Sequence, residues 1–150
     1  MQAGRLHASA LIVGDRGLLV AGPSGSGKTA LCLAILHHCA GTGRFARLVA
    51  DDHVQLRNAG GRVIATVPDA IAGLVEIYGF RPTKIDYLGA MVVDRMIRLV
   101  PSDDAPRFSE GTSETVEGAP LPCLHLPERN AGGNVTATLA WLGAHPFAFG

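Results

Sequence analysis

A glycine-rich run over residues 22–29, with the spacing G-x-x-x-x-G-K-T, sharply limits the folds open to this chain. A short β-prone run, residues 17–21, leads into it, and a segment with the apolar pattern of a buried helix, residues 29–39, follows it. A strand, a glycine loop and a helix in that order form a P-loop, in which backbone N–H groups and the helix dipole converge on phosphate. The sequence therefore predicts an α/β fold around a nucleotide-phosphate site.

Each position of the loop has an expected role. Lys28 carries a full charge toward the outer phosphates, and the Thr29 hydroxyl is an expected ligand for Mg²⁺. ATP and Mg²⁺ are thus the expected cofactors, and the flanking strand and helix weigh against the plainer interpretation of a glycine-rich turn followed by a chance Lys-Thr pair. The phosphate cradle is expected to comprise Gly22, Pro23, Ser24, Gly25, Ser26 and Gly27 together with Lys28 and Thr29.

Two adjacent acids, Asp51 and Asp52, end a short apolar run over residues 47–52. We interpret the run as a buried strand that delivers carboxylates to the sheet edge where α/β proteins bind ligands. One carboxylate can support the magnesium shell. The other, with its pKa raised by the like charge beside it, can take a proton from an attacking hydroxyl. A solvated strand end that happens to be acidic is the plainer alternative.

Alternating and continuous apolar runs predict further strands. Residues 6–13 should pair with residues 17–21 through the turn at 14–16. Residues 136–142 fit either a helix or a strand, and Arg95 and Arg98 are expected on the solvent face of their strand. Residues 101–130 contain five prolines and many polar residues, so they are expected to be mostly loop. The other expected strands are residues 54–57, 62–67, 74–78 and 90–100.

Composition limits the class of protein. With 150 residues and 47% hydrophobic content, the chain is expected to form a single domain over residues 1–150. Thirteen basic residues balance thirteen acidic ones, which argues against nucleic acid or a membrane as a partner. No apolar run is long enough to cross a membrane, and the spacing of Cys32, Cys39 and Cys123 fits core packing, so a soluble cytoplasmic protein is expected.

These motifs together resemble the catalytic domain of the bacterial HPr kinase/phosphorylase. The similarity rests on Leu-His-Ala-Ser at 6–9, the P-loop, Leu-Val-Ala-Asp-Asp at 48–52 and Val-Glu-Ile-Tyr-Gly at 75–79, and it continues through residues 106–107 to residues 121–130. The resemblance implies a P-loop core of the phosphoenolpyruvate carboxykinase type, with a mixed β-sheet flanked by helices. It also implies a shortened form without the family's N-terminal domain.

The activity implied by the resemblance is ATP-dependent phosphorylation of a seryl hydroxyl on HPr, the small phosphocarrier of the sugar phosphotransferase system. The reverse reaction implied is phosphorolysis, in which inorganic phosphate attacks phosphoseryl-HPr and leaves as pyrophosphate. A homohexamer is the assembly that the resemblance suggests.

Family roles carry over to matching positions of this sequence. The resemblance implies that Asp52 is the general base and that Asp51 supports it and the metal. Glu76 matches an acid of the family signature and would hold Mg²⁺ together with Thr29.

Three further residues gain a role through the resemblance alone. His7 matches a histidine close to the phosphates, Arg107 an arginine that stabilises transferred charge, and Arg129 a residue of the loop associated with dephosphorylation, where a guanidinium can grip phosphate. Tyr78 stands where the family signature usually has arginine. Either Arg81 restores that charge or phosphorolysis is weakened.

Two other functions stay open from the residues themselves. A small-molecule kinase of the nucleoside or shikimate type would also combine a P-loop with acids, but it normally needs an arginine-rich lid, and residues 101–130 supply only Arg107 and Arg129. A nucleotide-binding regulatory module that senses ATP without catalysis is the third hypothesis.

Overall fold

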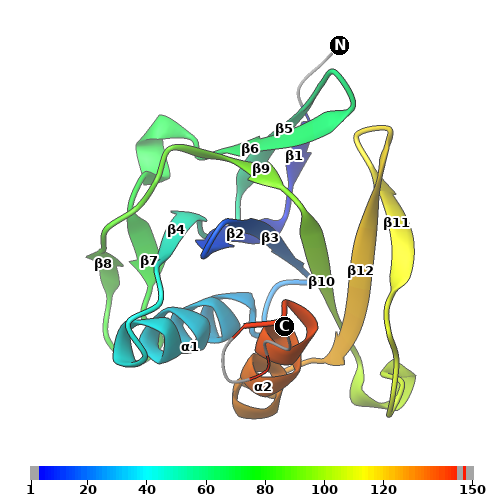
Figure 1. Cartoon of the computed structure of the whole chain (residues 1–150). Coiled ribbons are helices and arrows are strands. Elements are labelled where there is room, and N and C mark those ends of the chain that lie inside the picture. Colours follow the sequence, from blue (N-terminus) through cyan, green and yellow to red (C-terminus); the bar gives the residue numbers. More distant parts are fainter. Residues whose placement is uncertain (1–3, 145–146, 148–150) are drawn as a thin grey trace.

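Two β-sheets and a pair of helices form three layers (Figure 1) in the computed structural model, which describes residues 4–144 and 147. The six-stranded sheet in the middle has the strand order β11-β12-β10-β3-β2-β4. It is a mixed sheet, because β10 runs parallel to β3 and β12 whereas the other neighbours are antiparallel. Its strands are β2 (Ala8–Val13), β3 (Arg16–Ala21), β4 (Ala46–Ala50), β10 (Arg95–Val100), β11 (Thr112–Val116) and β12 (Ala119–Pro127).

A four-stranded antiparallel sheet covers one face of the central sheet. Side chains of both sheets, such as Leu19, Met96 and Val63, share one buried core between them. Burial of apolar surface between the layers is what holds the two sheets together. The strands of this second sheet, in order, are β1 (Gly4–Leu6), β5 (Val54–Ala59), β6 (Arg62–Thr66) and β9 (Ala90–Val93).

Both helices, α1 (Lys28–Gly41) and α2 (Ala131–Trp141), cover the opposite face of the central sheet (Figure 1). The second core lies there, where Leu31 and Leu139 of the helices pack against Ile97 and other strand residues. The predicted α/β class with a mixed sheet flanked by helices is confirmed. The segment that fitted a helix or a strand equally well is a helix.

The cysteines pack as the sequence predicts. Cys32 and Cys39 are buried on the face of α1 that meets the sheet, and Cys123 is buried in the core between the sheets. Burial is the main cause that raises the pKa of the Cys32 thiol, and the nearby carboxylate of Asp51 raises it further. These thiols therefore act as small apolar side chains.

The prediction of one strand over residues 90–100 is wrong, because Asp94 divides it into β9 and β10, which belong to different sheets. The Asp94 carboxylate accepts a hydrogen bond from the Gly17 N–H at 2.8 Å, and its own N–H donates to the Gly17 carbonyl at 2.8 Å. Asp94, whose side chain and backbone both form hydrogen bonds with Gly17, therefore marks the point where the chain passes from one sheet to the other.

The expectation that Arg95 and Arg98 share a solvent face is also wrong. Positions an odd number of residues apart in a strand point to opposite faces. Arg95 lies on the helix side, where its guanidinium stacks 5.0 Å from the Trp141 ring centre and donates to the Trp141 carbonyl. Arg98 lies on the other face and pairs with Glu114, a contact that spans β12.

The prediction that residues 101–130 are mostly loop is wrong as well, since they contain β11 and β12. The prolines of β12 alternate with buried residues: Pro120 and Pro122 are exposed, whereas Leu121 and Cys123 are buried. Pairing with β10 begins only at Cys123, so neither proline lies in the part of β12 that pairs with β10. Period-two burial, which the proline count masked, is the strand signal here.

The remaining boundaries differ less. The strand expected over residues 6–13 divides at His7 into β1 and β2, which lie in different sheets. The strand expected over 74–78 ends at Glu76 as β7 (Leu74–Glu76) and forms a small antiparallel pair with β8 (Pro82–Lys84). Two single-turn 3₁₀ helices complete the fold, at Asp69–Ile71 and Ser102–Asp104. Among the described residues, no helix has the length and apolar character needed to cross a membrane.

Candidate active site

The glycine loop lies between β3 and α1, as the sequence predicts. Gly25 and Gly27 have φ angles of 80° and 100°, a region that only glycine enters without strain. The Lys28 side chain is 4% exposed, and its ammonium group donates to the carbonyls of Gly22 at 2.8 Å and Pro23 at 3.0 Å. The loop is therefore wound around the lysine, and its curvature follows from the glycines.

Arg129, which follows β12, holds the loop from the side. Its N–H donates to the Ser26 carbonyl at 2.9 Å, and its guanidinium donates to the Gly25 carbonyl at 3.1 Å. A Cβ on Gly27 would lie 3.4 Å from the Arg129 nitrogen, so the two segments are in close contact. The structure thus places Arg129 at the loop, and most of its side chain, 72%, stays exposed toward solvent.

Asp51 is buried directly after β4, and side chains and backbone from three other elements converge on it. Its Oδ1 accepts hydrogen bonds from the Thr29 hydroxyl at 2.7 Å and the Ser9 hydroxyl at 3.0 Å, and its Oδ2 accepts one from the Glu76 N–H at 3.3 Å. The carboxylate is therefore fixed in orientation beside the start of α1. The sequence motif contained Ser9, but nothing in its pattern indicated this contact.

Asp52 follows Asp51 in the turn after β4, but its side chain has different partners. Its φ angle is 63°, which aspartate tolerates better than most residues. Its Oδ1 lies 3.2 Å from the Lys28 ammonium and 3.5 Å from Nδ1 of His7. Its N–H donates to the Ser9 hydroxyl at 3.0 Å. Three residues that the sequence assigned to the site, His7, Lys28 and Asp52, are thus brought together.

The expectation that a like charge raises the pKa of the base is wrong for Asp52. Burial by itself would raise the pKa of this carboxyl group, but the hydrogen bond and the charge of Lys28, and then those of His7, outweigh it and hold the pKa below its ordinary value. The carboxylate of Asp52 is consequently ionised at neutral pH and able to accept a proton.

A cavity of about 770 Å³ opens over this cluster. Its polar wall comes from the P-loop, Asp52, Glu76 and Arg129. Its other wall comes from residues 77–82, at the turn between β7 and β8, and is mostly apolar but includes Arg81. Tyr78 there is fully exposed, and Phe80 is 68% exposed. The sequence did not predict this wall, whose apolar residues are Ile77, Tyr78, Phe80 and Pro82.

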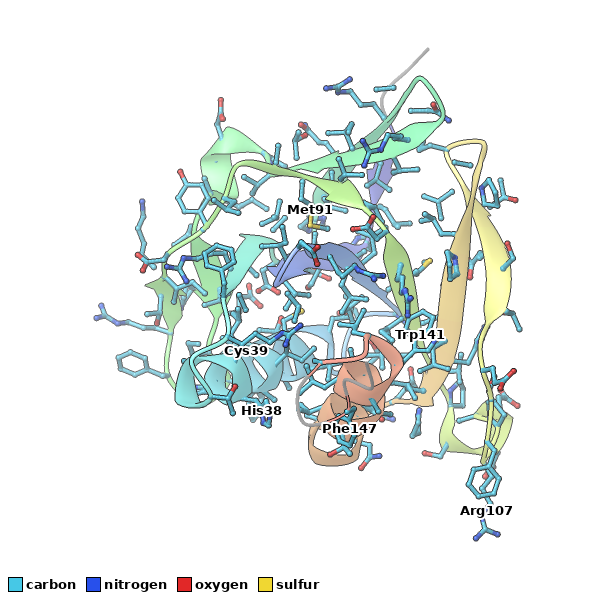
Figure 2. All side chains as sticks on the ribbon, viewed as in Figure 1. His38, Cys39, Met91, Arg107, Trp141 and Phe147 are labelled. Carbon is cyan, nitrogen blue, oxygen red and sulfur yellow. The ribbon has the colours of Figure 1, made fainter. Side chains whose placement is uncertain are left out.

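Arg107 does not reach this cavity. It belongs to the loop before β11, where its guanidinium lies 5.2 Å from the ring centre of Phe108, and Figure 2 shows it projecting away from the rest of the chain. It lines a separate groove between that loop, β12 and α2, next to Trp141. A catalytic role for Arg107 in the P-loop pocket of its own chain is therefore not supported.

The donor set of the cavity suits a magnesium nucleotide. Thr29 and Glu76 line the cavity, and the buried Asp51 carboxylate lies 2.7 Å from the Thr29 hydroxyl, so the oxygen ligands that Mg²⁺ prefers are gathered beside the glycine loop. One ammonium group and the N-terminal end of α1 supply positive charge for an anion. Next to them stands an ionised carboxylate, which is the group needed to deprotonate a hydroxyl.

Comparison with known proteins confirms the resemblance drawn from the sequence motifs. No family model matches the chain. The HPr kinase/phosphorylase of Clostridium beijerinckii is 32% identical over 99 residues, which is 64% of this chain and 31% of that protein. The protein of the same name from Clostridium tetani is 35% identical over 75 residues, which is 50% of this chain and 23% of that protein. The matches therefore span less than a third of these relatives.

A solved structure shows the same fold. The HPr(Ser) kinase/phosphatase from Coxiella burnetii superposes with a TM-score of 0.76, over 91% of this chain and 93% of that one, at 22% sequence identity. Three layers with a P-loop between a central strand and a covering helix are thus a known arrangement.

Proposed function

Because the chain resembles HPr kinase/phosphorylases in sequence and fold, we propose that it transfers the γ-phosphoryl group of ATP to a seryl hydroxyl of HPr or an HPr-like protein. The names of the Clostridium relatives support HPr as the partner, and the Coxiella structure carries the same substrate in its name. The chemistry of the cavity supports the reaction independently of those names.

The 3.2 Å contact between the Lys28 ammonium and the Asp52 carboxylate is the observation that carries this proposal. Because Lys28 is the residue expected to hold the transferred phosphate, this contact supports a role for Asp52 as the proton acceptor. The seryl oxygen would attack the γ-phosphorus, its proton would pass to Asp52, and ADP would leave with the electrons of the broken P–O bond. His7, 3.5 Å from the same carboxylate oxygen, helps to keep Asp52 ionised before the attack.

Mg²⁺ would be held by Thr29, Asp51 and Glu76. When bound, it would neutralise charge on the phosphate oxygens during transfer. Asp51 is suited to this position because hydrogen bonds from Ser9 and the Glu76 N–H already fix its orientation.

The reverse reaction belongs to the same proposal. In phosphorolysis, inorganic phosphate would occupy the loop, attack phosphoseryl-HPr and leave as pyrophosphate. The hydrogen bond from Arg129 to the Gly25 carbonyl, together with the exposure of its guanidinium, supports a role for Arg129 in binding that anion.

Incubation with γ-labelled ATP, Mg²⁺ and purified HPr tests the function. We expect label on a seryl residue of HPr. A Lys28→Met variant should transfer no label, whereas Lys84→Met, an exposed change in β8, should transfer as the wild type does. Added inorganic phosphate should return the label as pyrophosphate.

Two other outcomes would overturn the proposal. Label that appears on a small metabolite, from a mixture of nucleosides and hydroxy acids, would indicate a small-molecule kinase. Tight ATP binding by calorimetry, with no transfer to either acceptor, would indicate a nucleotide-sensing module.

A further inference from the structure

Two histidines flank Asp52 on the side of the site that faces solvent. His7 lies between β1 and β2, and His53 follows Asp52 directly. Their rings meet edge to face with centres 4.5 Å apart, and their side chains are 63% and 57% exposed. His53 has no role in the proposed transfer.

One ligand atom from each of His7, Asp52 and His53 lies within 4.8 Å of the others. The separations from the carboxylate are 3.5 Å for Nδ1 of His7 to Oδ1 and 3.8 Å for Nε2 of His53 to Oδ2. Ligand atoms on a four-coordinate zinc ion lie about 3.3 Å apart, because Zn–N and Zn–O bonds are about 2.0–2.2 Å long. The ligand atoms of the three residues, which lie within 4.8 Å of one another, would reach that spacing by rotation of the two exposed rings.

The closest contacts that Lys28 and His53 make with Asp52 are to different carboxylate oxygens. The Lys28 ammonium contacts Oδ1 of Asp52, and its buried side chain is fixed by two carbonyls of the loop. Oδ2 of Asp52 faces His53. A metal ion bound through Oδ2 therefore leaves the lysine contact in place.

The part of the chain that the structure describes contains a second cluster of residue types that bind metals, but its carboxylate and thiol are not available to a metal ion. Glu114, Cys123 and His125 also lie close together, but Arg98 holds both oxygens of Glu114. Burial, and then the hydrogen bond to Glu114, raises the pKa of the Cys123 thiol to about 12. That group is an ion pair with a protonated thiol, whereas the two imidazoles at Asp52 can reach solvent.

We propose that His7, Asp52 and His53 form a binding site for a divalent transition-metal ion of the Zn²⁺ class, separate from the magnesium ligands of the P-loop. Two imidazoles and one carboxylate form a ligand set that Zn²⁺ uses where a fourth position stays open to water. Mg²⁺ avoids such sites because it prefers oxygen ligands.

The proposed function gives this site a consequence. A metal ion on Asp52 occupies the carboxylate that would receive the seryl proton, so Zn²⁺ should inhibit transfer. This consequence depends on the proposed function, but binding itself does not, and the two can be tested separately.

Cobalt absorption tests the binding without ATP or HPr. The tag-free chain is titrated with Co²⁺, whose visible spectrum reports coordination by protein ligands, and Zn²⁺ is then added as a competitor. We expect one Co²⁺ per chain, displaced by one Zn²⁺. A His53→Ala variant should bind more weakly by at least the roughly 10- to 100-fold that loss of an outer partner costs at metal sites.

The matched control is His38→Ala, an exposed histidine on α1 (Figure 2), which should bind Co²⁺ as the wild type does. Circular dichroism and thermal melting confirm that both variants are folded. Unchanged Co²⁺ affinity in His53→Ala would overturn the proposal, and so would equal loss in the two variants. Transfer assays in Mg²⁺ alone then judge the kinase proposal independently of this result.

Discussion

At the scale of single residues, Asp52 links the parts of the site. Its carboxylate contacts Lys28 and His7, and its backbone N–H reaches Ser9. The contact with Lys28 has two effects: it lowers the pKa of the Asp52 carboxyl group, and it holds the carboxylate next to the glycine loop. Removing the negative charge from Asp52 while keeping its shape therefore separates proton acceptance from binding.

We predict that Asp52→Asn retains ATP binding but transfers phosphate on the order of a hundredfold or more slowly, which is the usual contribution of a general base. Calorimetry measures the first property and single-turnover transfer to HPr the second. Asp69→Asn makes the same chemical change at an exposed position that does not line the cavity, and it serves as the control. A full transfer rate in Asp52→Asn would mean that another group takes the proton.

The sequence was sufficient to predict the candidate site residues that belong to short motifs with a fixed spacing. The P-loop and the acid pair at Asp51 and Asp52 follow a strand directly, so position along the chain was enough to place them. Ser9 and His53 were missed for different reasons. The Ser9 contact joins residues 42 positions apart, through a strand pair whose register shifts next to Ala10, and no local pattern encodes such a contact. His53 adjoins the acid pair, and that adjacency was the available signal.

At the scale of elements, close packing at Gly17 fixes where the two sheets part. A Cβ at Gly17 would lie 1.8 Å from the Val92 carbonyl oxygen, so the strands approach each other through backbone alone. The same glycine exchanges hydrogen bonds with Asp94 at the break between β9 and β10. The only local signal for this break was Asp94, a residue disfavoured in strands, in an otherwise β-prone run, and the contact that decides its position is with a distant glycine.

Gly17→Ala should lower the free energy of unfolding by at least about 1–3 kcal/mol, because the backbone must move to relieve the overlap. Gly132→Ala is the matched control. Gly132 is an exposed position in α2 where a Cβ meets no atom within 4 Å. That change should stabilise the chain by up to about 1 kcal/mol, since alanine is the better helix former. Urea denaturation measures both, and equal midpoints for Gly17→Ala and the wild type would contradict the packing argument.

The Arg98–Glu114 pair ties β10 to β11 across β12. The hydrogen bond from Arg98 lowers the pKa of Glu114 more than burial raises it. A carboxyl group with a lowered pKa in the folded state stabilises the fold above the unfolded pKa, about 4.3 for glutamate, and this contribution is lost as pH falls below that value. The pair therefore stabilises the sheet at neutral pH and not in acid.

Glu114→Gln should thus reduce the melting temperature at pH 7 by about 2–4 °C, which corresponds to roughly 1 kcal/mol for a side-chain pair that is about a third exposed. The difference from the wild type should shrink as the pH is lowered through about 4. Thermal melts from pH 7 to pH 3 measure it, with the exposed Glu110→Gln as control. A difference that stays constant with pH would show that the charge of Glu114 contributes nothing.

At the scale of the whole molecule, the P-loop cavity and the groove beside Arg107 are separate and are lined by different residues. The predicted α/β class with a mixed central sheet is confirmed. Both helices pack on one face of that sheet, however, and a second sheet packs on the other face. Short apolar strands gave no indication of which sheet each would join. Arg107 is consequently far from the place that the motif comparison suggested.

A role for Arg107 in transfer requires a neighbouring copy of the chain. We predict that Arg107→Ala and Lys28→Met are each impaired in transfer, and that an equimolar mixture of the two recovers activity that neither shows alone, because one copy supplies the arginine and the other the loop. The labelled-ATP assay on co-refolded chains measures this. Full activity of Arg107→Ala by itself would remove Arg107 from the reaction.

The hydrogen bonds between Arg129 and the glycine loop join residues more than a hundred positions apart. In the sheet, β10 pairs with both β3, which precedes the loop, and β12, which precedes Arg129. During synthesis on the ribosome, the loop leaves the exit tunnel long before the segment that holds its shape. We therefore expect nascent chains that end before residue 129 to capture no nucleotide. Nucleotide binding would then appear in a single step, once the segment around Arg129 has emerged.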